Sequence, residues 1–405
     1  MLRSTKPQAA VRLGRRARLI MIGLTLLVTT AAGVLPTSRA AAVPTGGAEN
    51  GSRLMAGTAL YPRVIRLTHS GNADGQIIAS VVTFDATGGV GAIFRSTDNG
   101  ASFARIGSVR DPGATQGLCC STLYELPRRV AGLAAGTLLW SASVGQNAGD
   151  LRRMTLPVWA SSDHGQTWRR LAVAATSPNF GGLWEPEFTV SRDGRLVLFT
   201  SDESQQPTYS QVLDAATSPD GSNWGSLHNV IASDDPDLRP GMANVRQLPD
   251  QTYLMSYEVC GPGQDCRQRV RHSVDGIHWG DPTDLGTAVQ TADGSHFRHA
   301  PTISWYRDRG GHGRWLAVGQ MLYDGSGSVA AGNGSTIFSA VGSGQGSWTP
   351  APAPVRILDP YDNYCPNYSS SLLAMPERGT VLELATGYDD TGTCTTYFGT
   401  GELPR

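Results

Sequence analysis

Three ionisable side chains in this chain could together break a glycosidic bond. Glu185 lies between Trp184 and Pro186, and apolar neighbours of this kind raise the pKa of a carboxyl group. Glu258 lies near the end of a strand-like run, and Tyr368 precedes three serines further along the chain. A protonated carboxyl group can donate to a leaving oxygen while an ionised one attacks the sugar. The pattern therefore predicts glycoside hydrolysis if the fold brings these residues into one pocket.

Other polar residues lie at similar positions before strand-like runs and are candidate substrate contacts. Together with Trp184, these are Arg63, Asn244, Arg298 and His299. Glu187 is a rival of Glu185 as the acid, because alternation along a strand places both side chains on one face. Each candidate also has a structural interpretation. The charged residues could form surface pairs, and Tyr368 could be a core tyrosine whose hydroxyl is hydrogen-bonded.

The first 42 residues have the pattern of a secretory signal peptide. Residues 1–18 carry six basic residues and no acidic one, residues 19–35 form an apolar run, and small residues follow at 37–42. A membrane anchor is the alternative, but the run is shorter than the roughly 20 apolar residues of a spanning helix. We therefore expect a secreted protein in which residues 43–405 form one catalytic domain.

The composition favours an all-β protein without a highly charged partner. Acidic and basic residues nearly balance, with 34 and 33 in the chain, and we find no basic run or amphipathic helix. These features argue against nucleic acid or a membrane surface as a partner. Strand-like runs alternate with Gly, Pro, Asp and Asn, and no long segment has helical periodicity. We expect a monomer that needs neither a cofactor nor a metal.

Six cysteines follow the predicted signal peptide, and an even number in an exported chain favours disulfides. The expected pairs are Cys260–Cys266, which would hold the loop after Glu258, and Cys365–Cys394, which would staple the C-terminal region. Cys119 and Cys120 are adjacent, and they could pair with each other or stay free. No C-x-x-C spacing indicates a zinc site.

One short pattern occurs four times: Ser, any residue, Asp, then a Gly that is followed three positions later by an aromatic residue. The copies are residues 96–103, 161–168, 218–224 and 273–279. In such a turn, Asp accepts hydrogen bonds from the backbone, Gly adopts a positive φ and the aromatic ring packs beneath. The copies resemble the Asp-boxes of sialidase-like propellers. They indicate architecture, because the turn itself is structural.

A second periodicity agrees with the first. Hairpin turns that precede apolar strands recur about every 60 residues, at Gly75, Gly136, Gly194, Gln251, Gly313 and Gly379. Six such modules predict a six-bladed β-propeller, in which the first strand of each blade lines a central channel. Too few residues follow Gly379 for a whole blade, so we expect segment 55–67 to supply its missing strand. Two separate β-domains are the alternative, but no linker divides the modules.

The segments that hold the candidates resemble glycoside hydrolase family 93. They read YPRVIRL, LCCSTLYELP, WEPEF, RPGMANVRQLPDQTYLMSYE and NYSSSL, and the resemblance spans about residues 55 to 390. It implies a six-bladed propeller that cuts α-1,5-linked L-arabinan from the non-reducing end and releases arabinobiose with retention. It also implies that Glu185 is the acid/base, that Glu258 is the nucleophile and that Tyr368 hydrogen-bonds Glu258.

These roles predict a geometry and a protonation state for each carboxyl group. A retaining enzyme places its two carboxyl groups about 5–5.5 Å apart. Tyr368 and a cation such as Arg63 would keep Glu258 ionised, and the apolar neighbours of Glu185 would keep it protonated near neutral pH.

Two other functions stay open. A sialidase would need three arginines around the substrate carboxylate, an Asp acid/base and a Tyr–Glu pair, and Tyr368 with Glu258 could form that pair. However, the first strand reads Pro62-Arg63-Val64 where sialidases have R-I-P, and WEPEF supplies a Glu that a sialidase does not use. A sugar-binding propeller without catalysis is the third possibility.

Overall fold

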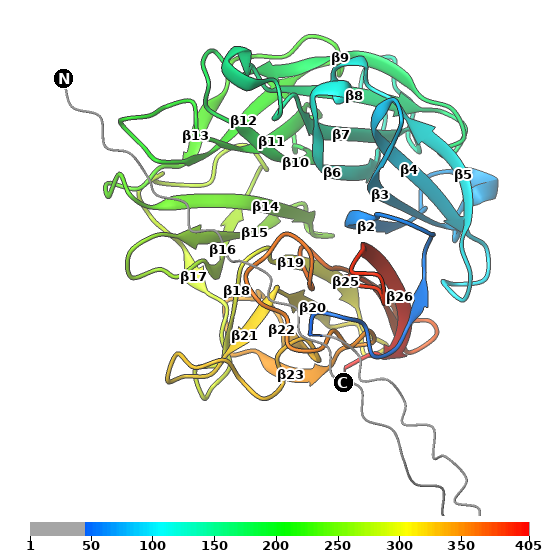
Figure 1. Cartoon of the computed structure of the whole chain (residues 1–405), viewed down its shortest axis with the longest axis vertical. Helices are drawn as coiled ribbons and strands as arrows, with labels where there is room; N and C mark the ends of the chain where they lie inside the picture. Colours follow the sequence, from blue (N-terminus) through cyan, green and yellow to red (C-terminus); the bar gives the residue numbers. More distant parts are fainter. Residues whose placement is uncertain (1–44, 405) are drawn as a thin grey trace, which may run out of the picture. The chain divides into compact units, whose positions relative to one another are not determined.

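The computed structural model describes residues 45–404, and most of its regular structure is β-strand. Six antiparallel sheets follow one another along the chain and form a six-bladed β-propeller (Figure 1). The fold class predicted from the sequence is confirmed. The predicted signal peptide lies outside the described residues. Three short 3-10 helices lie between strands: η1 (Gly71–Ala73), η2 (Pro112–Gln116) and η3 (Gly149–Leu151).

Each of the first three blades is a four-stranded sheet whose strands follow chain order. Blade 1 contains β2 (Leu60–Arg66), β3 (Ile77–Asp85), β4 (Gly88–Ser96) and β5 (Ala104–Val109). Blade 2 contains β6 (Leu118–Glu125), β7 (Leu138–Val144), β8 (Thr155–Ser161) and β9 (Arg169–Thr176). Blade 3 contains β10 (Leu183–Val190), β11 (Leu196–Asp202), β12 (Val212–Ser218) and β13 (His228–Ile231).

The last three blades vary this plan. Blade 4 contains β14 (Arg239–Gln247), β15 (Tyr253–Cys260) and β16 (Arg267–Ser273), extended by β17 (Thr287–Ala288), β18 (His296–Arg298) and β21 (Met321–Tyr323). Blade 5 contains β19 (Thr302–Arg307), β20 (Gly313–Val318), β22 (Thr336–Val341) and β23 (Thr349–Pro352). Blade 6 contains β24 (Ser371–Met375), β25 (Thr380–Tyr388), β26 (Cys394–Glu402) and β1 (Ser52–Arg53).

The short strand β1 closes the ring. It pairs antiparallel with β26, so that Ser52 lies opposite Phe398 and Arg53 lies opposite Tyr397. The prediction that segment 55–67 completes the last blade is therefore wrong, because that segment contains β2, the first strand of blade 1. The described residues form one compact unit, which argues against two separate β-domains.

The predicted turns lie where the propeller requires them. Gly75, Gly136, Gly194, Gln251 and Gly379 all have positive φ and lie between the first and second strands of their blades. In blade 5 the residue with positive φ is Gly311, whereas Gly313 begins β20. The four Ser-x-Asp turns follow third strands, and in each the Ser hydroxyl accepts a hydrogen bond of 2.8 Å from the Gly N–H.

Hydrophobic clusters fill the space between neighbouring blades. Trp140 is fully buried between blades 1 and 2, Phe188 between blades 2 and 3, and Trp315 between blades 4 and 5. Burying an aromatic side chain of this size stabilises a fold by roughly 1.5–3 kcal/mol. These contacts hold the first strand of each blade in a fixed position, and those strands carry the candidate site.

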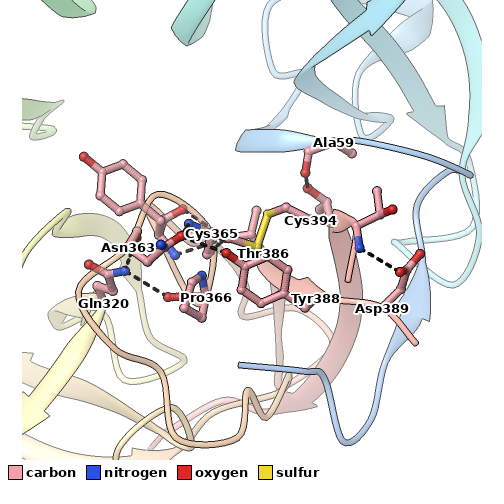
Figure 2. Close-up of a disulfide and its surroundings, with 12 residues drawn as sticks. Ala59, Gln320, Asn363, Cys365, Pro366, Thr386, Tyr388, Asp389 and Cys394 are labelled. Carbon is pink, nitrogen blue, oxygen red and sulfur yellow. Dashed lines mark hydrogen bonds between the residues drawn. A yellow bond between two sulfur atoms is a disulfide. The ribbon is translucent and has the colours of Figure 1, made fainter. Parts of the chain in front are cut away.

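All six cysteines form disulfides. The predicted pairs Cys260–Cys266 and Cys365–Cys394 are confirmed, and Cys119 pairs with its neighbour Cys120. The Cys365–Cys394 bond ties the loop before β24 to the start of β26 (Figure 2). Among residues 45–404, none of the helices combines the length and the hydropathy needed to cross a membrane.

Candidate active site

A cavity of about 480 Å³ lies among the first residues of β2, β6 and β10, the end of β15 and the loop before β24. Its polar and aromatic wall residues are Tyr61, Trp184, Glu185, Glu203, Gln211, Arg239, Glu258, Asp362, Asn363, Tyr364 and Tyr368. The disulfide Cys119–Cys120 and the sulfur-bearing Cys260 also line it. The three residues predicted to do the chemistry, Glu185, Glu258 and Tyr368, are therefore brought to one cavity.

A β-bulge at the same place in four blades shapes the cavity. The bulged residues Tyr61, Cys120, Glu185 and Met242 have φ between 50° and 61°, and the strand register shifts at each. A bulge redirects a side chain, and a positive φ at a residue other than glycine is strained. Tyr61, Cys120 and Met242 pack together with Ala300 as an apolar cluster. Glu185 thus places a carboxyl group where the other three blades have apolar side chains.

Glu185 is half-buried and is held from two neighbouring strands. Its Oε2 accepts a hydrogen bond of 2.6 Å from Ser201 Oγ, and its backbone N–H donates to Ser143 Oγ at 3.1 Å. Ser201 Oγ also accepts the backbone N–H of Met242 at 3.0 Å. Burial raises the pKa of Glu185 to about 7, and the nearby carboxylate of Glu203 adds to the rise. The predicted elevation of this pKa is thus present.

Glu258 occupies a position that holds serine in the two preceding blades. Strand pairing places Glu258 opposite Gly241, as Ser143 is opposite Cys119 and Ser201 is opposite Trp184. In all three blades, this second-strand side chain accepts a backbone N–H from the blade that follows. Glu258 therefore combines a structural hydrogen bond with a carboxyl group that faces the cavity.

The environment of Glu258 is almost closed. The side chain is buried, its Oε2 accepts the N–H of Ala300 at 2.7 Å, and Cys260 Sγ lies 3.4 Å from Oε1. Burial, together with repulsion from Glu185, raises the pKa of Glu258 to about 8. Since two buried carboxylates in one cavity repel each other, we infer that the pair holds at least one proton near neutral pH.

Tyr368 does not make the predicted hydrogen bond to Glu258. Its hydroxyl group instead lies 3.7 Å from Met242 Sδ. Burial raises the pKa of Tyr368 well above its usual value, and the carboxylates of Glu185 and Glu258 contribute. The hydroxyl therefore stays protonated and can donate to a carboxylate or to a ligand in the cavity. The expectation that Tyr368 and Arg63 hold Glu258 ionised is not met, because neither side chain donates a hydrogen bond to Glu258.

Arg63 and Asn244 lie one layer below the cavity and do not line it. Each follows the bulged residue of its strand by two positions. Arg63 donates to the hydroxyl and carbonyl oxygens of Ser369 at 3.0 and 3.2 Å, and its guanidinium lies 4.2 Å from the centre of the Tyr61 ring. Asn244 accepts the N–H of Ile303 at 2.9 Å. The prediction that Arg63 and Asn244 line the cavity is therefore wrong, because a bulge shifts the strand register just before each of them.

Glu187 belongs to the same deeper layer and is fully occupied by other groups. It accepts hydrogen bonds from Thr122 Oγ1 at 2.9 Å, from Asn244 Nδ2 and Val245 N at 3.2 Å, and from Arg246 Nη1 at 2.9 Å. It lines a second hollow, and none of the residues that line the cavity also lines this hollow. Glu187 therefore has the contacts of a structural ion-pair residue, and it is the weaker candidate for the acid.

Arg298 and His299 differ in their distance from the site. Arg298 pairs with Asp265 at 3.3 Å and stacks on the Tyr323 ring at 3.8 Å, so its contacts are outside the cavity wall. His299 Nε2 lies 3.8 Å from the carboxylate of Asp362, which does line the cavity. Burial lowers the pKa of His299. Only His299 is therefore adjacent to the site, through Asp362.

One polar wall of the cavity was not predicted. Arg239 donates to Glu203 Oε1 at 2.6 Å and to Gln211 Oε1 at 2.7 Å, while Trp184 Nε1 donates to Glu203 Oε2 at 2.9 Å. The predicted contact Trp184 thus belongs to this network. Arg239 begins the same strand-like run that leads to Glu258, which was an available signal. Glu203 and Gln211 lie at strand ends, where the sequence carries no motif.

One cluster in residues 45–404 has the composition of a metal site. Side-chain atoms of Cys260, Cys266 and His299 lie within 4.8 Å of one another. Both sulfur atoms belong to the same disulfide, and metals bind thiolates. The oxidised cluster therefore does not present a metal-binding donor set.

No protein-family model and no curated protein matches this chain. Among solved structures, an α-L-arabinanase of Penicillium chrysogenum complexed with arabinobiose has a TM-score of 0.72 and 23% identity, covering 89% of this chain and 99% of that one. A family 93 α-L-arabinofuranosidase of Fusarium graminearum, also with arabinobiose, has a TM-score of 0.69 and 23% identity, with 88% and 98% covered. A Hadza microbial sialidase has a TM-score of 0.56 and 16% identity, with 85% and 66% covered. This chain therefore has the propeller fold seen in arabinose-acting glycoside hydrolases and, more distantly, in a sialidase.

Proposed function

We propose that this protein is a retaining glycoside hydrolase that acts on arabinan. The observation that carries the proposal is the cavity shared by Glu185 and Glu258, whose carboxyl groups both have pKa values raised by burial. Glycoside hydrolysis needs such a pair, with one proton available for the leaving oxygen. The similar structures that contain arabinobiose support arabinose as the sugar.

In the proposed reaction, Glu258 is the nucleophile and Glu185 is the acid/base. A carboxylate oxygen of Glu258 attacks the anomeric carbon while the bond to the leaving oxygen breaks and Glu185 protonates that oxygen. A water molecule then gives a proton to Glu185, and its oxygen replaces Glu258 at the anomeric carbon. Two displacements on opposite faces return the original configuration. This mechanism requires the carboxyl groups to lie about 5–5.5 Å apart in a complex with substrate.

The hydrogen-bond partners support this division of roles. The partner of Glu258 is the backbone N–H of Ala300, which can only donate and therefore lowers the pKa of Glu258. Burial and the charge of Glu185 outweigh this hydrogen bond, so the pKa of Glu258 lies at about 8, above the value of about 7 for Glu185. The mechanism therefore requires that substrate binding leaves the proton of the pair on Glu185. The partner of Glu185 is the Ser201 hydroxyl, which can donate or accept. Glu185 changes its protonation state twice in each cycle, and the Ser201 hydroxyl can hydrogen-bond both the ionised and the protonated form.

The charges of the cavity favour a neutral sugar. Four carboxyl groups line it, and Arg239 is the one arginine among its wall residues. That guanidinium is already paired with Glu203 at 2.6 Å. A sialidase would need three arginines for the carboxylate of its substrate, so the sialidase alternative is disfavoured. Tyr368 and Glu258 alone do not distinguish the two reactions.

The finer assignment follows the resemblance to glycoside hydrolase family 93. We propose exo-action on α-1,5-linked L-arabinan, with arabinobiose released from the non-reducing end. A cavity formed by the first strands and one loop is suited to a chain end. We also propose that the protein is secreted as a monomer after removal of residues 1–42, and its three disulfides are typical of oxidising compartments.

A substrate panel tests the proposal directly. Purified protein and its Glu258→Gln variant are incubated with linear α-1,5-arabinan, aryl arabinosides and sialyllactose, and the products are separated by chromatography. We expect arabinobiose from arabinan with the wild-type protein alone. Release of sialic acid would instead support a sialidase. Binding of arabinan without any product would support a sugar-binding propeller.

A further inference from the structure

We propose that Tyr361 and Tyr364 form an aromatic platform outside the cavity that binds the outgoing part of the polysaccharide. This inference rests on the proposed function, because it places the bond to be cut between Glu185 and Glu258. If a chain end enters the cavity, the rest of the chain must pass over the rim. The platform would contact the sugar residues on the leaving-group side of the cut.

The exposure of the two tyrosines is the first observation. Tyr364 is 63% exposed and Tyr361 is 43% exposed, although both are large aromatic residues. Tyr364 also lines the cavity, so its ring is continuous with the candidate site. Flat aromatic faces are common contacts in ligand sites, since they bury a large area with little loss of conformational freedom. A sugar ring that leaves the cavity would meet the Tyr364 ring first.

The loop that carries the platform is fixed from below. Gln320 is fully buried, and its Nε2 donates to the carbonyl oxygens of Tyr361, Asn363 and Pro366 at 3.0, 2.6 and 3.1 Å. Cys365, which follows Tyr364 in this loop, is tied to β26 by its disulfide (Figure 2). These contacts hold the backbone of an exposed segment in one conformation.

A side-chain hydrogen bond from β25 also holds the loop. Tyr388, at the end of β25, donates its hydroxyl to Asn363 Oδ1 at 2.8 Å. Asn363 lies between Tyr361 and Tyr364, so this contact holds the loop from a second side. An exposed aromatic residue on a fixed backbone binds a ligand with a smaller ordering cost than one on a free loop.

The charge beside the platform defines the class of ligand. Asp362 lies between the two tyrosines in sequence, its side chain is 71% exposed, and it lines the cavity. A carboxylate at this position repels acidic polysaccharides and can accept hydrogen bonds from sugar hydroxyl groups. The platform is therefore suited to a neutral glycan such as arabinan.

The test compares a long substrate with one that cannot reach the rim. The substrates are linear α-1,5-arabinan and arabinobiosyl fluoride, whose leaving group is a single atom. We expect the Tyr361→Ala/Tyr364→Ala variant to lose about tenfold in kcat/KM on arabinan, which corresponds to about 1.4 kcal/mol. Tyr364 lines the cavity and Tyr361 does not, so the Tyr361→Ala single variant should turn over the fluoride as the wild type does. The double variant should lose less activity on the fluoride than on arabinan. The Tyr361→Phe/Tyr364→Phe variant keeps both rings and should retain most activity on arabinan.

Two results would contradict the proposal that Tyr361 and Tyr364 bind the substrate. Equal losses on both substrates would show a structural role for the loop, and unchanged activity on arabinan would show that the rings contact no substrate. If the wild-type protein cleaves neither substrate, the proposed function fails. The platform is then tested by electrophoresis through gels that contain arabinan: retardation that is lost in the double Ala variant supports it, and migration unaffected by arabinan refutes it.

Discussion

Glu185 and Glu187 are two residues apart on β10, yet they have opposite environments. Glu185 faces the cavity with one hydrogen bond to its carboxyl group, and burial raises its pKa to about 7. Glu187 lies one layer below and accepts four hydrogen bonds, including one from the guanidinium of Arg246. The carboxyl group of Glu185 is therefore free to contact a ligand, whereas that of Glu187 links side chains and backbone of neighbouring blades.

The β-bulge explains this difference. In a regular strand, residues two apart point to the same face. The bulge at Glu185 gives it a φ of 50° and shifts the register between Trp184 and Glu187. The same bulge in blades 1, 2 and 4 separates an upper layer that includes Tyr61 and Met242 from a lower layer that includes Arg63 and Asn244. In this propeller, one repeated backbone irregularity therefore divides the layer that faces the cavity from the layer that holds the blades together.

The largest effect is expected in the upper layer. Replacing Glu258 by Gln removes the nucleophile, while the amide oxygen can still accept the N–H of Ala300. We expect turnover of arabinan to fall by at least about 10³-fold. Far-UV circular dichroism and the melting temperature should stay close to those of the wild type. Activity near the wild-type level would remove Glu258 from the mechanism.

The lower layer should respond in the opposite way. Glu187→Gln breaks the pair with Arg246 and weakens four hydrogen bonds, so we expect a loss of roughly 1–3 kcal/mol in the free energy of unfolding. Activity per folded molecule should stay within a few-fold of the wild type. Denaturant titration and kcat at a temperature where the variant is folded measure the two quantities. A stable but inactive Glu187→Gln protein would reverse the comparison of the two carboxyl groups.

A smaller effect concerns the dependence of stability on pH. Burial raises the pKa of Glu258 and of Glu383 to about 8 in the folded protein, above their values in an unfolded chain. The folded state therefore keeps these protons where the unfolded chain has lost them, so stability is fully present below the unfolded pKa of about 4.3, falls as pH rises and levels off above about 8. We expect the melting temperature to decrease between about pH 5 and pH 8 and to show no further decrease from these groups at higher pH.

Glu383 gives the matched control for this effect. It is buried in β25, accepts the N–H of Val355 at 2.9 Å and does not line the cavity. Glu383→Gln should reduce the slope of melting temperature against pH by up to the equivalent of about 1.4 kcal/mol per pH unit, without changing the pH profile of kcat. An unchanged slope would show that Glu383 is not protonated in the fold.

Much of the architecture could be predicted from the sequence, because its signals are local. The glycines at hairpin turns and the Ser-x-Asp turns act through their own backbone, and their spacing gave six blades. The closing strand was missed because β1 has only two residues and no pattern of its own. Glu185 and Glu258 were found because they belong to a first strand and to a second strand, and Tyr368 was found because it lies in the loop that leads into a first strand.

The rest of the site depends on features that leave no mark in the sequence. Tyr61 and Met242 adopt positive φ although neither is glycine, so the bulges were invisible and Arg63 and Asn244 were placed one layer too high. Glu203 and Asp362 lie at a strand end and in a loop, where tertiary contacts alone decide which side chains meet. The expected Tyr368–Glu258 bond failed because Met242 lies beside the Tyr368 hydroxyl.

The most direct test of the central claim uses azide as an external nucleophile. With an activated aryl arabinobioside, azide should restore turnover to both Glu185→Ala and Glu258→Ala, since the small anion fits the space left by each carboxyl group. NMR of the product should show a glycosyl azide of retained configuration from Glu185→Ala, in which azide attacks the glycosyl-enzyme formed by Glu258. It should show inverted configuration from Glu258→Ala, in which azide replaces the nucleophile. The reverse pair of configurations, or rescue of Glu187→Ala instead, would contradict the account.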